Sequence, residues 1–394
     1  MKSHNPIRIL VYKNDLCWPR RSGHDVHTYE MMRAWIMSGA MVSLATSKEI
    51  QPRAIDGLDL ETTTSLGSAC RGQTASPPGN GLPQRFIRYW GISFSEVQAL
   101  ADLAEEIKAD AVIASGLDAL PFLYKIRKGI RVWYAADEWT WHHLSLMRFN
   151  EPSTWRELRG AIIKGIYERA YRPYCDRIWV VSDADRRAMR IVSGVKNIDV
   201  LPNGVDGDYF HPLQDQAGSE RSLVFWGRLD FGPNVQGLQW FCRNIWPDLH
   251  AKYNDAIFTI IGSKPIRDIF DLEKIPGIKI LPDLDDLRPE VARNQVVVLP
   301  FISGGGIKNK LLEAAAMGKP VVCSKRAATG LNGKFPAIVA GSKSEWVTAI
   351  KKLWNNHAER DYLGSSARNW VQTQHTWKKA AEDALISIRK SLES

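Results

Sequence analysis

The residues that point most clearly to chemistry follow a short apolar run that ends at Pro300. Three consecutive glycines, 304–306, turn the chain there, and a segment with helical periodicity begins near Ile307. Glycines let backbone N–H groups approach an anion closely, and the dipole of a helix favours negative charge at its N-terminus. Lys308 adds a cation at this helix start, where a basic side chain opposes the dipole unless an anion is bound. The pattern predicts a site for a diphosphate.

A carboxylate, Glu313, follows this glycine turn by one to two helical turns, and Lys310 places a second cation between them. A carboxylate at that distance can accept hydrogen bonds from both hydroxyls of a ribose. The alternative is a tight turn followed by a solvated helix face. The whole string of glycines, lysines and carboxylate favours the nucleotide site.

Two series of short apolar, β-branched runs must position these residues. They are residues 7–12, 41–46, 110–115, 131–136, 177–182, 198–201, 222–227, 256–262, 278–281, 295–300, 320–324 and 335–340. Because the runs alternate with segments of helical periodicity, they predict parallel sheets covered by helices on both faces. We therefore predict an α/β fold of two doubly wound, Rossmann-like domains with a cleft between them. Such sheets bind ligands at the carboxyl ends of their strands.

The domain boundary follows from a polar, loop-like stretch after Val205. We place the first domain at residues 1–207 and the second at residues 208–376. Residues 377–394 have the pattern of a terminal helix, which we expect to pack back on the first domain.

Four segments resemble the family 4 glycosyltransferases (glycosyl transferases group 1), which have the GT-B fold. They are Pro202–Asp206, Phe225–Asn234, Ile260–Ser263 and Glu313–Val322. The resemblance implies that the first domain binds an acceptor and the second a nucleotide-sugar. It also implies that Glu313 holds the ribose and that Arg228 meets the diphosphate. An arginine directly after a strand-end glycine suits bidentate phosphate binding, and a surface salt bridge is the alternative.

Two positions depart from the family pattern. Gly305 stands where the family usually has a second glutamate that contacts the donor sugar, and Asn234 stands where it often has a lysine. We expect Lys308 to supply the missing charge. The predicted donor-binding residues are Gly227, Arg228, Asn234, Gly262, Leu284, Gly305, Gly306, Ile307, Lys308 and Glu313. The predicted catalytic residues are Asp137, Arg228 and Lys308.

The acceptor side is predicted from residues 19–27 and from Asp137. Residues 19–27 open a helix and resemble a degenerate form of the family's glycine-rich acceptor loop, in which Gly23 is the surviving glycine. Packing explains Gly23 equally well and explains His24 better, whereas His27 is assigned to the acceptor side. Asp137 follows a predicted strand directly, so its carboxylate is the candidate for steering the acceptor hydroxyl.

A metal site is not predicted. Asp283-Leu284-Asp285 has the Asp-x-Asp form of metal-dependent glycosyltransferases of another fold, but it precedes a helical stretch, so we interpret it as helix capping. The adjacent His142 and His143 have no third ligand at a suitable spacing. Five scattered cysteines without a Cys-x-x-Cys pair indicate neither a disulfide framework nor a zinc site. We expect a metal-independent enzyme without a cofactor, since the nucleotide-sugar is a substrate.

These features imply a hexosyltransferase-type enzyme that moves a sugar from a nucleoside-diphosphate sugar to an acceptor hydroxyl, in polysaccharide, lipid-linked or other glycoconjugate synthesis. The resemblance implies retention of the anomeric configuration. We find no convincing pair of carboxylates for double displacement, which agrees with retention without a protein nucleophile. Two alternatives stay open: a nucleotide-sugar epimerase of the same fold, and a non-catalytic nucleotide-sugar-binding protein, suggested by Gly305.

Charge and hydropathy bear on the partners. The net charge of +9 is spread evenly over both halves of the chain, which argues against a nucleic-acid-binding protein. Without a signal peptide or an apolar stretch of roughly 20 residues, we expect a cytoplasmic protein. Segments 85–90 and 156–177 mix cations with aromatic residues, so peripheral contact with the inner face of the membrane is a further expectation. A solvated helix face packed by buried aromatic residues is the alternative there. The expected acceptor is a glycan or a lipid-linked glycan.

Overall fold

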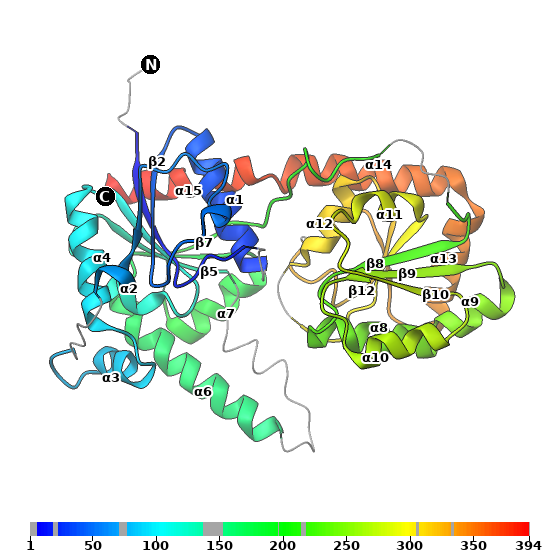
Figure 1. The fold of residues 1–394 in the computed structure, drawn as a ribbon, viewed down its shortest axis with the longest axis horizontal. Coiled ribbons are helices and arrows are strands. Elements are labelled where there is room, and N and C mark those ends of the chain that lie inside the picture. The colour runs from blue at the N-terminus through cyan, green and yellow to red at the C-terminus, as the bar shows by residue number, and fades with distance from the viewer. Residues whose placement is uncertain are drawn as a thin grey trace. The chain divides into compact units, whose positions relative to one another are not determined.

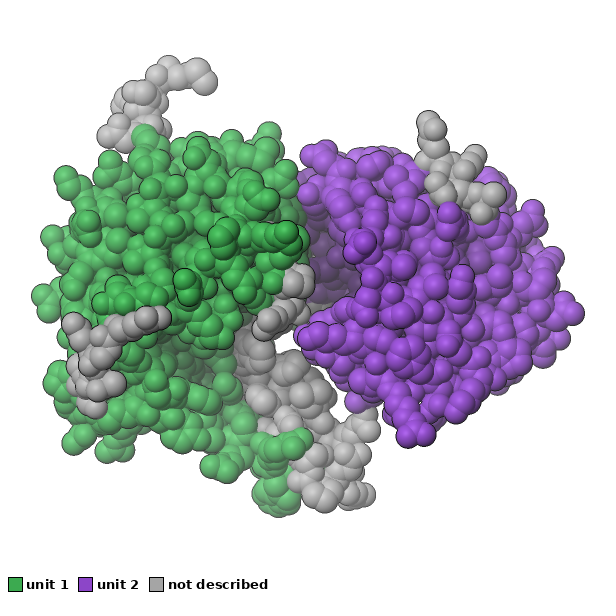
Figure 2. Space-filling model, viewed as in Figure 1, with its two compact units in different colours: residues 1–203, 377–394 green, residues 204–376 purple. Residues whose placement is uncertain are grey.

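Two parallel sheets organise the structure, a computed structural model shown in Figure 1. It describes residues 6–18, 23–70, 77–136, 153–195, 197–213, 218–304, 307–331 and 335–393. The chain divides into unit 1, which holds residues 1–203 and 377–394, and unit 2, which holds residues 204–376 (Figure 2). Unit 1 is therefore built from two separate stretches of the sequence, and unit 2 from one.

In the described part of unit 1, seven strands form a parallel sheet in the order β3-β2-β1-β4-β5-β6-β7. They are β1 (Arg8–Tyr12), β2 (Met41–Thr46), β3 (Thr62–Ser65), β4 (Ala111–Ser115), β5 (Ile130–Ala136), β6 (Arg177–Val180) and β7 (Ile198–Val200). The central strands β1 and β4 are mainly apolar and almost completely buried, except for the exposed Arg8 at the start of β1. Strands covered on both faces require such continuous apolar runs.

Helices cover both faces of this sheet. They are α1 (Gly23–Met37), α2 (Leu66–Ala69), α3 (Leu82–Tyr89), α4 (Phe94–Glu106), α6 (Ser153–Tyr171), α7 (Asp183–Ser193) and α15 (Trp377–Leu392), with short 3-10 turns η1 (Pro52–Ala54), η2 (Leu120–Lys125) and η3 (Arg172–Tyr174). One core joins α1 and α15 to one face of the sheet, and a second joins α4, α6 and η2 to the other (Figure 1). The apolar stripe of α15, with Trp377, Ala381, Leu385 and Ile388, is part of the first core.

Unit 2 repeats this plan. Its described part has a six-stranded parallel sheet in the order β10-β9-β8-β11-β12-β13. The strands are β8 (Ser222–Trp226), β9 (Ile257–Gly262), β10 (Ile278–Pro282), β11 (Val296–Leu299), β12 (Val321–Ser324) and β13 (Ile338–Ala340). The helices are α8 (Gly232–Asn244), α9 (Trp246–Lys252), α10 (Arg267–Phe270), η4 (Asp271–Lys274), α11 (Arg288–Arg293), α12 (Asn309–Ala316), α13 (Lys343–Asn355) and α14 (His357–Gln374).

The predicted fold class, two doubly wound Rossmann-like domains, is confirmed. Each predicted apolar run coincides with a strand, within a few residues at its ends. The strand β3 was not predicted. It reads Thr-Thr-Thr-Ser and lies at the edge of its sheet, where polar side chains can face water.

Candidate active site

Most of the predicted donor-binding residues follow two neighbouring strands of unit 2, whereas Gly262 ends β9 and Leu284 follows β10. β8 and β11 pair in parallel, and the order of the sheet reverses direction between them. Doubly wound sheets bind ligands at this switch point, beyond the carboxyl ends of the strands. Residues 227–234 follow β8 and residues 300–310 follow β11, so the fold brings two distant stretches of sequence to one place.

Two of the predicted glycines permit close approach between backbones. Gly227 has φ +144°, and a Cβ at Gly262 would lie 1.7 Å from the carbonyl oxygen of Gly227. The N–H of Gly227 donates to the carbonyl of Ile261 at 2.9 Å, which ties the end of β8 to β9. A side chain at Gly262 would displace the backbone of Gly227, and a side chain at Gly227 would be strained by the positive φ and would meet the side chain of Lys310. Both positions are therefore required by the shape of the site, whether or not a ligand touches them.

The side chain of Lys310 reaches from α12 to the end of β8. A Cβ at Gly227 would lie 2.6 Å from the Nζ of Lys310 and 3.2 Å from the Nδ2 of Asn234. Burial lowers the pKa of Lys310, and the negative charge of Glu313 opposes this shift. A half-buried ammonium group beside a strand-end glycine is suited to binding an anion. From the sequence, Lys310 was predicted only as a second cation of the helix, because no local pattern connects it to Gly227.

The amide of Asn234 lies beside this lysine and is 2% exposed. Its Nδ2 donates to the carbonyl of Arg228 at 2.7 Å. Its Oδ1 is buried and has no hydrogen-bond partner within the described parts of the chain. An unpaired buried acceptor costs about 1–3 kcal/mol, so a donor group on a ligand would be stabilising here.

The carboxylate of Glu313 is held across the switch point by Trp226. The indole Nε1 donates to the Oε2 of Glu313 at 2.7 Å. Burial raises the pKa of Glu313, while the hydrogen bond from Trp226 and the charge of Lys310 oppose the rise. Trp226 was not among the predicted residues. Its position directly before the strand-end glycine was the signal that could have identified it.

The guanidinium of Arg228 forms an ion pair in the structure. Its Nε and Nη2 donate to the two carboxylate oxygens of Asp230, each at 3.0 Å. This is the salt bridge that the sequence left as the alternative to phosphate binding. A diphosphate would have to compete with Asp230 for that edge of the guanidinium.

The helix that carries Glu313 begins at Asn309, two residues after the predicted start at Ile307. Ile307 is buried and therefore anchors the turn. Lys308 is the N-cap, with φ −87° and ψ 105°. Gly304 has φ +91°, and a Cβ there would lie 3.6 Å from the Nζ of Lys308. The lysine thus lies over the start of the glycine turn.

The predicted capping role of Asp283 and Asp285 is wrong. α11 begins at Arg288, whose backbone N–H donates instead to the Oδ1 of Asp286 at 2.9 Å. Asp283 adopts φ +50° in the turn after β10, and Leu284 is exposed. In the described ranges, no group of three or more His, Cys, Asp or Glu side chains is placed to hold a metal ion.

Comparison with known proteins identifies the family. The family model described as Glycosyltransferase Family 4 matches residues 21–209, and the one described as Glycosyl transferases group 1 matches residues 220–356. The chain belongs to the group 1 glycosyltransferases. No protein of curated function matches the sequence.

Solved structures support the GT-B fold of this glycosyltransferase. Sucrose-phosphate synthase from Thermosynechococcus elongatus is 15% identical with a TM-score of 0.72, over 98% of this chain and 99% of that chain. A glycosyltransferase from Rickettsia africae is 13% identical with a TM-score of 0.70, over 99% and 100%. HepE from Anabaena, solved with UDP and glucose, is 14% identical with a TM-score of 0.65, over 97% and 99%.

The predicted acceptor residues of the glycosyltransferase separate in unit 1. Gly23 is exposed at the start of α1. His27 is 3% exposed, lies 2.6 Å from the hydroxyl of Tyr134 through its Nε2, and packs edge-on against Trp377. Burial lowers the pKa of His27 to about 3. His27 is therefore a core residue, which corrects its predicted place on the acceptor side.

His24, interpreted from the sequence as a packing residue, lies at the switch point of the unit 1 sheet, between β1 and β4. Its Nδ1 is 3.1 Å from the Nζ of Lys13, which pairs with Asp25 at 3.2 Å. Burial and then the charge of Lys13 lower the pKa of His24 to about 3, so the imidazole is neutral at pH 7. Its Nε2 is buried without a partner among the residues described. Three predicted site residues lie outside the described residues: Asp137, Gly305 and Gly306.

Proposed function

We propose that this glycosyltransferase is a retaining, metal-independent hexosyltransferase that moves a sugar from a nucleoside-diphosphate sugar to a hydroxyl of a glycan or lipid-linked glycan. The observation that carries the proposal is the meeting of Glu313 and Lys310 at the end of β8, through Trp226 and Gly227 respectively. A fixed carboxylate suits the ribose hydroxyls, and a nearby ammonium suits the diphosphate. HepE was solved with UDP-glucose, and TarM from S. aureus with UDP, which supports this class of donor.

The proposed reaction breaks the bond between the anomeric carbon and the diphosphate and forms a bond from that carbon to the acceptor oxygen. The acceptor proton leaves with the diphosphate. Catalysis then depends on positioning and on stabilising the departing negative charge. We propose that Arg228, Lys308 and Lys310 stabilise this negative charge. All three residues follow the two strands at the switch point.

On the acceptor side we propose Asp137 as the residue that steers the acceptor hydroxyl, and Gly23, at the start of α1, as a second acceptor-side residue. The neutral imidazole of His24 is a third candidate, because it lies at the switch point and its Nε2 has no partner among the described residues. We further propose a cytoplasmic protein that contacts the membrane peripherally. No helix in the described part of the chain has the length and apolar character needed to cross a bilayer.

Transfer should proceed at the same rate in EDTA as in magnesium or manganese, because lysine and arginine side chains take the place of a metal at the diphosphate. The measurement is the rate of nucleoside diphosphate release with each addition. Activity that is lost in chelator and restored by metal would overturn the metal-independent assignment.

The reaction class is tested by incubating the protein with nucleotide-sugars, with and without an acceptor panel, and following the anomeric proton by NMR. We expect donor consumption only when acceptor is present, with the donor's anomeric configuration in the product. An isomer formed from donor alone would identify an epimerase. Thermal stabilisation by a nucleotide-sugar without turnover on any acceptor would identify a binding protein.

A further inference from the structure

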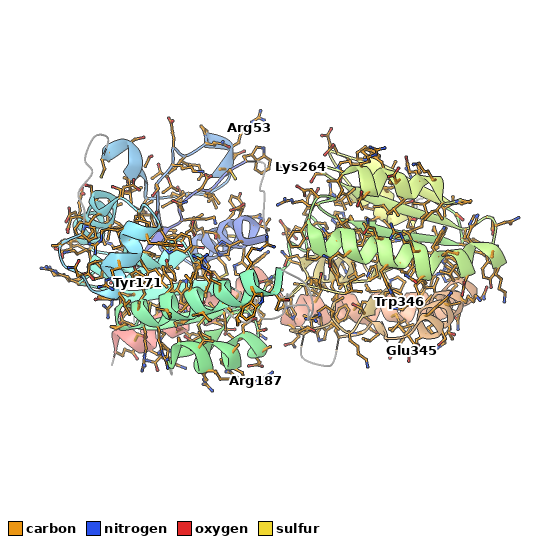
Figure 3. All side chains as sticks on the ribbon, turned by 90° about the horizontal axis from the view of Figure 1, so that it is seen from below. Arg53, Tyr171, Arg187, Lys264, Glu345 and Trp346 are labelled. Atoms are coloured by element: carbon orange, nitrogen blue, oxygen red, sulfur yellow. The ribbon has the colours of Figure 1, made fainter. Side chains whose placement is uncertain are left out.

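Unit 1 carries a face of exposed apolar and basic side chains, formed by α3, α6 and α7. We call it the α3–α6–α7 face. α6 contacts both of the other helices. Figure 3 shows α6 and α7 side by side, with Arg187 labelled on α7. The three helices come from different parts of the sequence, so the face exists only in the folded unit.

The outer side of α6 has a regular pattern. Exposed residues recur every three or four positions, and each is either apolar or basic: Trp155, Arg159, Ile162, Ile166 and Arg169. Residues at this spacing share one side of a helix. The indole of Trp155 is 76% exposed. Large apolar side chains in such a row stay in water only at a cost, unless something covers them.

The neighbouring helices α3 and α7 also carry exposed apolar and basic side chains. At the end of α3, Tyr89 is 63% exposed and Trp90 is also exposed. The Nζ of Lys164, on α6, lies 4.7 Å from the ring centroid of Trp90, which joins the two helices at the surface. On α7, Ile191 is 74% exposed beside the exposed Arg187.

The charge of the face is strongly positive. The three helices contain nine basic and four acidic residues. Three of the four acidic residues are buried or paired, and so contribute little free negative charge to the surface. Glu168 is buried, Asp183 pairs with Arg186 at 2.5 Å, and Asp185 accepts a hydrogen bond from Ser182. Arg159 and Arg169 form no salt bridge with any residue the structure describes. An anionic partner is therefore favoured over a neutral one.

We propose that the α3–α6–α7 face rests on an anionic lipid bilayer. A bilayer surface satisfies both halves of the composition, because tryptophan and tyrosine settle at the headgroup level, isoleucines enter the acyl boundary and arginines bind headgroup phosphates. A soluble acidic polymer would use the arginines but would leave the isoleucines and tryptophans in water. The inference rests on the peripheral membrane contact proposed above and assigns a surface to it. It does not depend on the proposed reaction, since it concerns only the exposed side of unit 1.

The test is flotation of the purified full chain with lipid vesicles. One set is pure phosphatidylcholine, and the other contains roughly one-third phosphatidylglycerol, an anionic lipid. We expect the protein to float with the anionic vesicles at low salt, to be released as salt rises, and to stay unbound with phosphatidylcholine. Protein that stays at the bottom of the gradient with every vesicle and at every salt concentration would overturn the proposal. If transfer activity is nevertheless present in that preparation, the proposed reaction would still stand.

Two double variants separate lipid from a soluble polyanion. Arg159→Gln with Arg169→Gln should weaken binding to anionic vesicles about tenfold to thirtyfold, as expected for two basic residues at such a surface. Trp155→Ser with Ile162→Ser should also weaken vesicle binding, but should leave binding to soluble dextran sulfate unchanged. The control is Arg243→Gln with Tyr362→Ser, exposed positions of unit 2 that should have no effect. Vesicle binding that loses nothing in the Trp155 and Ile162 variant would indicate a polyanion site instead and overturn the bilayer assignment.

Discussion

Lys310→Ala should lower the turnover number by about 10²–10³ while changing the Michaelis constant for the donor much less. The ammonium lies against Gly227 at the end of β8, where a departing diphosphate gains negative charge. A fixed cation at that point stabilises the transition state more than the bound donor, and the loss of one such contact costs about 2.7–4 kcal/mol. Steady-state kinetics on the purified variant, with circular dichroism to verify folding, provide the measurement.

The sharper form of this experiment asks whether Lys310 replaces the lysine that the family often has at position 234. Asn234→Lys, introduced into the Lys310→Ala background, should restore part of the rate, because Lys310 and Asn234 both face Gly227. The sequence had predicted this role for Lys308, but Lys310 is the lysine that lies at Gly227 beside Asn234. Lys308→Ala is therefore the matched comparison, since it removes the same charge from the same helix start. If Lys310 only balances the charge of Glu313, its loss will reduce donor affinity and thermal stability together, and Asn234→Lys will not restore turnover.

Glu313→Gln should weaken the binding of a nucleotide-sugar by about 10- to 150-fold, corresponding to the roughly 1.5–3 kcal/mol of a hydrogen bond to a charged group. Glutamine keeps the size of the side chain but replaces the carboxylate, whose two oxygens accept hydrogen bonds from the two ribose hydroxyls, by a neutral amide. Calorimetric titration gives the dissociation constant. Compared with the intact donor, a donor whose ribose lacks one hydroxyl should bind more weakly to the wild-type protein and almost equally well to the variant. Equal losses in the two proteins would remove Glu313 from the ribose site.

The pH dependence of binding provides an independent measure of the same carboxylate. Burial raises the pKa of Glu313, so it takes up a proton at a higher pH than an ordinary glutamate. Donor binding, which needs the ionised form, should weaken as the pH falls through this raised pKa, and the dependence should disappear in Glu313→Gln. For the protein without donor the sign is opposite. A raised pKa in the folded state makes folding more favourable as the pH falls toward the ordinary value.

The sequence was sufficient for the sheets because strands buried on both faces must be continuous runs of apolar, β-branched residues. It failed at β3, where Thr62–Ser65 carries no such run. It was sufficient for Glu313, whose distance from the glycines is set by one helix. It was insufficient for Lys310 and Trp226, because their roles depend on which strands lie side by side.

The errors at His27 and at Asp283 have a similar cause. His27 is buried by Trp377, a residue far along the sequence that no local pattern connects to it. At Asp283 the local pattern was real but the helix began later than expected, so Asp286 binds the first N–H. Helix starts are the least certain features of a sequence pattern, since several acidic residues in a row offer equivalent caps.

The placement of α15 has a consequence for the order in which the protein is made. Residues 204–376 leave the ribosome as one uninterrupted stretch and form unit 2 by themselves, whereas unit 1 needs residues 377–394. Trp377, Ala381, Leu385 and Ile388 complete the apolar core between α1 and the sheet. During synthesis the first-made half of the chain is therefore the last to finish folding. Until α15 arrives, its docking surface on α1 is open to chaperones or to wrong partners, whereas every residue of unit 2 has by then been made.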